Sequence, residues 1–160
     1  MEERTTVLYV DDNPKSSRLL ASVLEECGFR MISKTDPLDA LALCRRTSFD
    51  LALLDYEMPV MSGAQLAREI KGMMPEVPIV LISGRTSIPA KELEFVDAHF
   101  GFGTALDDLL WSMRILSPPK LVRRQPTTTG EVEVSKGRPA PAGRAGRYER
   151  MPESRWADLT

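Results

Sequence analysis

The chain has 160 residues, a formal net charge of −2 and two cysteines. This length suits one ordinary domain with some residues left over. A charge this close to zero gives no indication of a nucleic-acid or membrane partner, and no apolar stretch approaches the roughly 20 residues that span a bilayer. The cysteines lack metal-ligand spacing, so we interpret them as reduced thiols of a cytoplasmic protein.

Residues 1–116 alternate between segments typical of buried strands and segments typical of helices. Short apolar runs predict strands at residues 7–10, 29–33, 51–55, 77–82 and 98–102. Apolar residues at helical spacing predict helices at residues 14–27, 37–46, 63–73, 89–95 and 104–116. This alternation predicts an α/β fold, a doubly wound, five-stranded parallel sheet with helices on both faces.

The composition changes at Ser117. Residues 117–160 hold six of the twelve prolines and four of the ten glycines, and they carry nine Lys or Arg against five acidic residues. Such a segment buries too little apolar surface to offset the entropy of ordering the chain. The sequence therefore predicts one folded domain over residues 1–116 and a disordered tail, rich in Pro, Gly and Arg, over residues 117–160.

Three of the predicted strands end on polar residues. Asp11 and Asp12 follow the first strand, Asp55 ends the third, and Ser83 follows the apolar run of the fourth. The carboxyl ends of parallel strands meet at one edge of a sheet, where ligands bind. A cation relieves the repulsion among three carboxylates, and carboxylate oxygens suit Mg²⁺. One carboxylate can then act as a nucleophile toward a phosphoryl group.

Each of these residues also has an ordinary structural interpretation when it is taken alone. An aspartate at a strand end is commonly a turn or helix-cap residue, and Asp12 comes just before a good helix opening at Asn13 and Pro14. Ser83 has the same alternative as a turn hydroxyl. Their occurrence at three strand ends, in the order that a parallel sheet requires, favours a shared site.

Three stretches resemble the receiver domain of bacterial two-component response regulators. They are LYVDDNP at residues 8–14, LALLDYEMPVMSG at 51–63 and VPIVLISG at 77–84. The D-x-x-M-P-x-x-x-G pattern that begins at Asp55 is highly specific for this family. The resemblance covers residues 5–116 and implies a flavodoxin-like (βα)5 fold with strand order 2-1-3-4-5.

The resemblance also assigns roles to individual residues. Asp55 matches the aspartate that accepts the phosphoryl group. The carboxylates of Asp11, Asp12 and Asp55, together with the backbone carbonyl of Glu57, would bind Mg²⁺. Ser83 matches the switch serine or threonine, and His99 falls at the position of the usual aromatic switch residue.

One position departs from the family pattern. Receivers usually carry a lysine at the end of the fifth strand, and its ammonium pairs with the acidic site. Here the stretch VDAHFGFG places Phe102 at that position, and no lysine occurs between Lys91 and Lys120. Arg85 is a candidate substitute for the missing cation. The segment between the fourth and fifth strands is also short, which predicts a truncated fourth helix.

The function implied by the resemblance is that of a response regulator. It would accept a phosphoryl group from a histidine kinase or phosphotransfer protein and signal to an unknown output protein by contact, with dimerisation as a family tendency. One alternative is a receiver-like binding module that works without phosphorylation. Another is a phosphatase with an aspartate nucleophile, which is disfavoured because Glu57 stands where such enzymes favour a second aspartate. We therefore expect no enzyme activity.

Overall fold

The structure is a computed structural model that describes residues 2–118 and 120–121. Its main sheet has five parallel strands in the spatial order β3-β2-β4-β5-β6. These strands are β2 (Thr6–Val10), β3 (Arg30–Lys34), β4 (Leu51–Asp55), β5 (Ile79–Ser83) and β6 (Ala98–Gly101). The doubly wound fold and the predicted strand order 2-1-3-4-5 are thereby confirmed.

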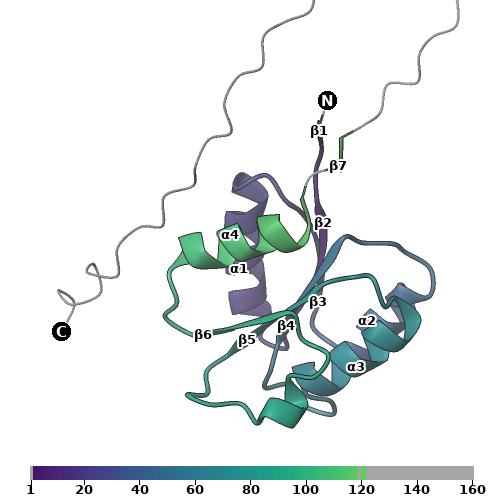
Figure 1. Cartoon of the computed structure of the whole chain (residues 1–160), viewed down its shortest axis with the longest axis vertical. Coiled ribbons are helices and arrows are strands. Elements are labelled where there is room, and N and C mark those ends of the chain that lie inside the picture. The colour runs from purple at the N-terminus through teal and green to yellow at the C-terminus, as the bar shows by residue number, and fades with distance from the viewer. Residues whose placement is uncertain (1, 119, 122–160) are drawn as a thin grey trace, which may run out of the picture. The chain divides into compact units, whose positions relative to one another are not determined.

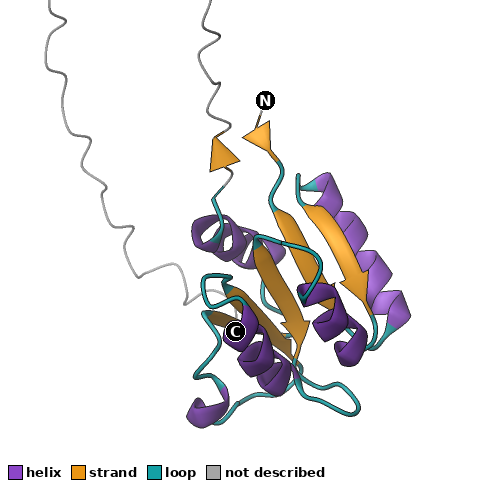
Figure 2. Ribbon diagram, turned by 90° about the vertical axis from the view of Figure 1, so that its right-hand side faces the viewer, coloured by secondary structure: helices purple, strands orange, loops and turns teal. Residues whose placement is uncertain are grey.

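Four α-helices cover the two faces of this sheet. They are α1 (Pro14–Glu26), α2 (Pro37–Cys44), α3 (Gly63–Met73) and α4 (Leu106–Leu116). Helices α1 and α4 lie on one side and α2 and α3 on the other (Figures 1 and 2). Successive side chains of a strand point to opposite faces. In β2, Val7 and Tyr9 pack with Leu24 of α1, whereas Leu8 and Val10 belong to the core under α2 and α3.

Side-chain caps fix where three of the helices begin. The Asn13 carboxamide accepts hydrogen bonds at the start of α1, and the Asp36 carboxylate does so at the start of α2. Pro14 and Pro37 follow these caps, at positions where a missing N–H costs nothing. Ser62 forms a capping box at the start of α3. The caps of α1 and α3 lie in the same loops as the acidic residues, so they help to hold those loops in place.

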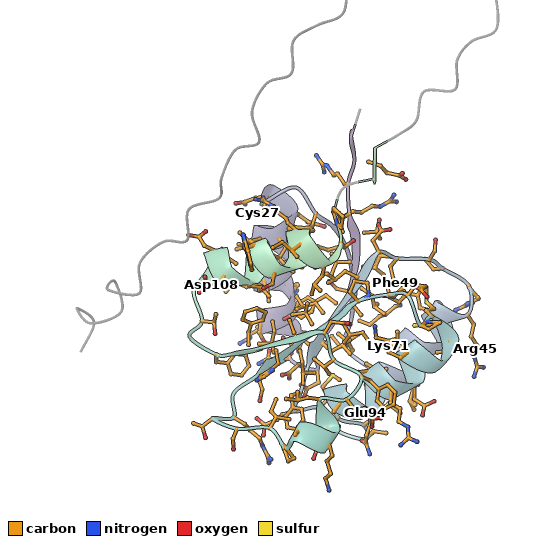
Figure 3. All side chains as sticks on the ribbon, viewed as in Figure 1. Cys27, Arg45, Phe49, Lys71, Glu94 and Asp108 are labelled. Atoms are coloured by element: carbon orange, nitrogen blue, oxygen red, sulfur yellow. The ribbon has the colours of Figure 1, made fainter. Side chains whose placement is uncertain are left out.

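The helix predicted at residues 89–95 is wrong. The structure has only a single 3₁₀ turn, η1 (Ala90–Glu92), in this segment. Just beyond this turn, the Asp97 carboxylate accepts a hydrogen bond from the Ile79 N–H at 2.7 Å and pairs with Lys71 at 2.9 Å (Lys71 is labelled in Figure 3). These contacts, together with the packing of Leu93, Phe95 and Val96 on the core under α2 and α3, hold the segment in a path that is not α-helical.

The structure also contains a second, two-stranded sheet that the sequence did not predict. Strand β1 (Glu2–Glu3) pairs antiparallel with β7 (Lys120–Leu121), a segment that the sequence places in the tail. Within the predicted tail, residues 119 and 122–160 lie outside the described residues. None of the helices that the structure describes is long and apolar enough to cross a membrane.

Candidate functional site

The acidic residues lie at the point where the sheet topology reverses. The chain leaves β2 for β3 on one side and later returns to β4 on the other, so the loops after β2 and β4 diverge. Asp11 directly follows β2, and Asp55 is the last residue of β4. Carboxylate oxygens of Asp11, Asp12 and Asp55 all lie within 4.8 Å of one another. The structure therefore brings together the three carboxylates predicted to bind a metal.

Asp11 is held by two hydrogen bonds. Its side chain is buried; the Tyr9 hydroxyl donates to Oδ2 at 2.7 Å, and the Asn13 N–H donates to Oδ1 at 2.8 Å. Each Asp11 oxygen thus already accepts one hydrogen bond, which leaves it fewer free lone pairs for a cation. Burial and the hydrogen bond to Asp11 also raise the pKa of Tyr9, so its hydroxyl keeps its proton at neutral pH.

Sequence reasoning missed the role of Tyr9. A signal was present, because residues two apart along a strand point to the same face. Tyr9 and Asp11 have this spacing, and a buried tyrosine hydroxyl requires a hydrogen-bond partner.

Asp55 has one buried oxygen that lacks a partner. Its Oδ1 atom is inaccessible to solvent and makes no hydrogen bond within the described part of the chain. Burial, followed by the charges of Asp11 and Asp12, raises the pKa of Asp55 to about 6, although the backbone amides of Glu57 and Tyr56 act in the opposite direction. An unsatisfied carboxylate oxygen beside two other carboxylates fits a hard cation such as Mg²⁺.

A glycine permits the close approach that positions Asp55. A Cβ atom at Gly63 would collide with the backbone carbonyl of Asp55 and would lie 2.8 Å from a methyl carbon of Leu81. The Gly63 N–H donates to the Tyr56 carbonyl at 3.0 Å. The glycine in the D-x-x-M-P-x-x-x-G pattern therefore has a steric reason, since any side chain there would displace the end of β4.

The two predicted switch residues lie around one hollow. Ser83 is buried at the end of β5, and its Oγ accepts a hydrogen bond from the Arg85 N–H at 2.9 Å. His99 is exposed and lies on the neighbouring strand β6. Both residues line a hollow of about 320 Å³, together with Phe102. The structure thus brings Ser83 and His99 near each other, while their switching role stays a prediction.

Arg85 does not supply a cation to the acidic cluster. Its Nε atom pairs with Oε1 of Glu57 at 3.0 Å, and its guanidinium lies 5.6 Å from the ring centre of Tyr56. The Tyr56 hydroxyl in turn donates to Oε2 of Glu92 at 2.6 Å. Arg85 is therefore engaged with Glu57 and Tyr56, a group of contacts that sequence reasoning did not foresee.

Phe102 places an uncharged ring beside the site. Its side chain is 71% exposed, and its N–H donates to the Ser83 carbonyl at 2.9 Å. The ring lies over Gly84, where a ring carbon would be 2.8 Å from an added Cβ. Over residues 2–118, no Lys or Arg forms an ion pair with Asp11, Asp12 or Asp55.

The family model of the response regulator receiver domain matches residues 7–99 of this chain. The chain belongs to the response regulator receiver family. It is 35% identical over 85 residues to a response regulator receiver protein of Anaeromyxobacter sp. (strain Fw109-5), covering 53% of this chain and 36% of that protein. It is 31% identical over 134 residues to protein-glutamate methylesterase/protein-glutamine glutaminase 3 of Hahella chejuensis, covering 74% of this chain and 38% of the relative.

The receiver thus spans well under half the length of these curated relatives. Among solved structures it resembles the response regulator TrrA of Thermotoga maritima in complex with Mg²⁺-BeF, with 26% identity and a TM-score of 0.66 over 70% of this chain and 98% of that one. The chemotaxis protein CheY4 of Vibrio cholerae, 23% identical, has a TM-score of 0.65 over 71% and 99% of the two chains and supports the fold. Receiver domains bind Mg²⁺ at an acidic cluster such as this one.

We expect Mg²⁺ affinity to depend more on Asp12 than on Asp11. Asp11 already accepts two hydrogen bonds, whereas Asp12 is more exposed and contributes its carboxylate to the same cluster. Asp12→Ala should weaken Mg²⁺ binding by roughly tenfold or more, and Asp11→Asn should weaken it less. Calorimetric titration measures both, with Asp108→Asn as the control at an exposed position of α4 (Figure 3). Wild-type affinity in Asp12→Ala would contradict the assignment.

Proposed function

We propose that this receiver is a cytoplasmic phosphoacceptor of a two-component phosphorelay. Asp55 accepts a phosphoryl group from a histidine kinase or phosphotransfer protein, and output passes by protein–protein contact, with no enzymatic turnover. The observation that carries the proposal is the partnerless, buried Oδ1 of Asp55, within a cluster that includes Asp11 and Asp12. TrrA, 26% identical to this chain, has been solved in complex with the histidine kinase ThkA, which supports a kinase as the donor.

The residues present are suited to the transfer step. A carboxylate oxygen of Asp55 attacks the phosphorus of a phosphohistidine, the O–P bond forms as the P–N bond breaks, and the departing imidazole keeps the electron pair and takes up a proton. Asp11 and Asp12, with Asp55 and the Glu57 carbonyl, would hold Mg²⁺, which offsets negative charge on the phosphoryl oxygens. The Ser83 hydroxyl accepts from the Arg85 N–H and retains its own proton to donate to a phosphoryl oxygen.

The proposal predicts that Asp55 is the sole site of phosphorylation. Intact-mass measurement after treatment with acetyl phosphate should show one added phosphoryl group in the wild-type protein, and only when Mg²⁺ is present. Asp55→Asn should add none, because an amide is not a competent nucleophile here. Asp108→Asn, which alters an exposed aspartate on α4, should behave like wild type. A phosphoryl group on Asp55→Asn would refute the assignment.

A second candidate function is supported by Phe102. With an uncharged ring at the position of the family lysine, the domain could serve as a binding module that works without phosphorylation. The same mass measurement separates the two functions. Wild-type protein that gains no phosphoryl group in the presence of Mg²⁺ would favour the binding module.

A further inference from the structure

A cavity of about 380 Å³ opens beside the acidic cluster. Asp11 and Asp55 lie at its lining, and most of the remaining wall is apolar. The apolar wall comes from α1, β6 and α4, chiefly Leu19, Leu20, Val23, Phe100 and Leu106. The volume falls within the range of small-molecule pockets, which combine apolar walls with a few polar groups that set orientation.

The acidic cluster at the edge of this cavity carries more negative charge than one divalent ion offsets; Asp12 belongs to this cluster, although it does not line the cavity. Three carboxylates carry a formal charge of −3 when ionised, so a bound Mg²⁺ would leave −1. Phe102 lines the cavity without contributing charge, and Arg85 is paired with Glu57. A buried, unpaired charge is costly, so a single additional positive charge would be stabilised here.

We propose that this cavity binds a free organic amine. Its ammonium group lies at Asp11 and Asp55, and its aliphatic body packs against Leu20 and Val23 of α1. The apolar wall offers no ligands to a second metal ion, while the carboxylates disfavour an uncharged apolar molecule, because it would leave them unpaired. The aromatic rings of Phe100 and Phe102 in the lining add a further attraction for a cation. The ammonium shares Asp11 and Asp55 with the proposed phosphorylation site, but its binding requires no phosphoryl transfer.

Hexylamine is a suitable probe, because it joins a primary ammonium to an aliphatic chain. In two-dimensional NMR titrations without any phosphodonor, with and without Mg²⁺, hexylamine should shift resonances of α1 and of the loop between β6 and α4. Hexanol, which lacks the charge, and ammonium chloride, which lacks the chain, should each bind at least tenfold more weakly. Equal binding of hexanol, or shifts confined to other surfaces, would overturn the proposal.

A second arm distinguishes a free amine from a lysine side chain of a partner protein. Nα-acetyl-lysine amide carries the same ammonium on a stem that is attached to a polar backbone. The proposal expects it to bind more weakly than hexylamine, because its amide groups would be forced against the apolar wall. If the lysine derivative bound more tightly, the cavity would be a docking point for a protein lysine, and the free-amine proposal would fall.

Two matched variants test the location. Leu19 lines the cavity and is 70% exposed, whereas Leu38 on α2 is 52% exposed and lies outside the cavity lining. Leu19→Lys should supply a competing ammonium and weaken hexylamine binding by at least tenfold, while Leu38→Lys, with the same change in net charge, should bind as wild type. Because both positions are exposed, both variants should fold, which their melting curves verify. Unchanged binding in Leu19→Lys would contradict the site.

Discussion

Metal-free Asp55→Asn is expected to melt above the wild-type protein at neutral pH. In the fold, burial and the charges of Asp11 and Asp12 raise the pKa of Asp55 to about 6 from an ordinary value of 3.8. The carboxylate is therefore less favourable in the folded chain than in the unfolded one, and asparagine removes that cost. Because Asp55 is only half-buried, solvent screening reduces the gain to about 1–2 kcal/mol, or roughly 3–6 °C in melting temperature.

The same pKa shift sets the direction of the pH dependence. Between about pH 6 and pH 4, the folded chain binds a proton at Asp55 that the unfolded chain does not, so folding is favoured as the pH falls through this window. The melting temperature of metal-free wild-type protein should therefore rise as the pH is lowered from neutral to about 5. Asp55→Asn should lack the part of this rise that comes from Asp55. Added Mg²⁺ should stabilise wild type at neutral pH by satisfying the same carboxylates.

Asp108→Asn provides the control for this measurement. It makes the same chemical change at an exposed position in the first turn of α4, where an acidic residue interacts favourably with the helix dipole. It should lower the melting temperature slightly or leave it unchanged. A melting temperature of Asp55→Asn at or below that of wild type would show that the buried carboxylate is already satisfied.

The features predictable from sequence are those encoded in short stretches of chain. Apolar runs such as residues 51–54 identify buried strands, and an acid immediately after such a run must lie at the sheet edge. The positions of Asp11, Asp12 and Asp55 followed from this rule. The first residues of α1, α2 and α3 were equally predictable from local sequence, because capping residues and prolines act within one helical turn.

The features that sequence reasoning missed depend on contacts between distant segments. In place of the helix expected at residues 89–95, the segment packs Leu93 and Phe95 on the core and leads into Asp97, which is bound by Ile79 and Lys71 of other elements. The pairing of β1 with β7 joins the two ends of the described chain through a two-residue ladder, too short for any pattern. The engagement of Arg85 by Glu57 likewise depends on how two loops approach each other.

Phe102→Lys is expected to reduce the dependence of thermal stability on Mg²⁺ and to strengthen the response to phosphorylation. Phe102 and Asp55 line the same cavity, so we expect a lysine at position 102 to extend its ammonium toward the acidic cluster. That positive charge would relieve part of the carboxylate repulsion that Mg²⁺ otherwise offsets. It would also be available to pair with phosphoryl oxygens on Asp55.

The loss of the ring itself should cost little. The side chain of Phe102 is 71% exposed, so the substitution removes little buried surface from the folded structure, including the contact with Gly84. Phe102→Met measures this contribution, because methionine retains apolar surface without charge. If Phe102→Met and Phe102→Lys both melted well below the wild type, the ring would belong to a packed, constitutive binding surface instead.

The deciding measurement compares wild type, Phe102→Met and Phe102→Lys, each melted without ligand, with Mg²⁺, and with Mg²⁺ and beryllofluoride. TrrA, a structural neighbour, has been solved with Mg²⁺-BeF, so this fold accommodates the phosphoryl mimic. Phe102→Lys should show the smallest shift with Mg²⁺ alone and the largest additional shift with the mimic. Because Phe102→Met carries no charge, it should follow wild type in both respects. If the mimic stabilises wild type as strongly as Phe102→Lys, the uncharged ring does not impair coupling, and the acidic cluster responds to a phosphoryl group without a cation at position 102.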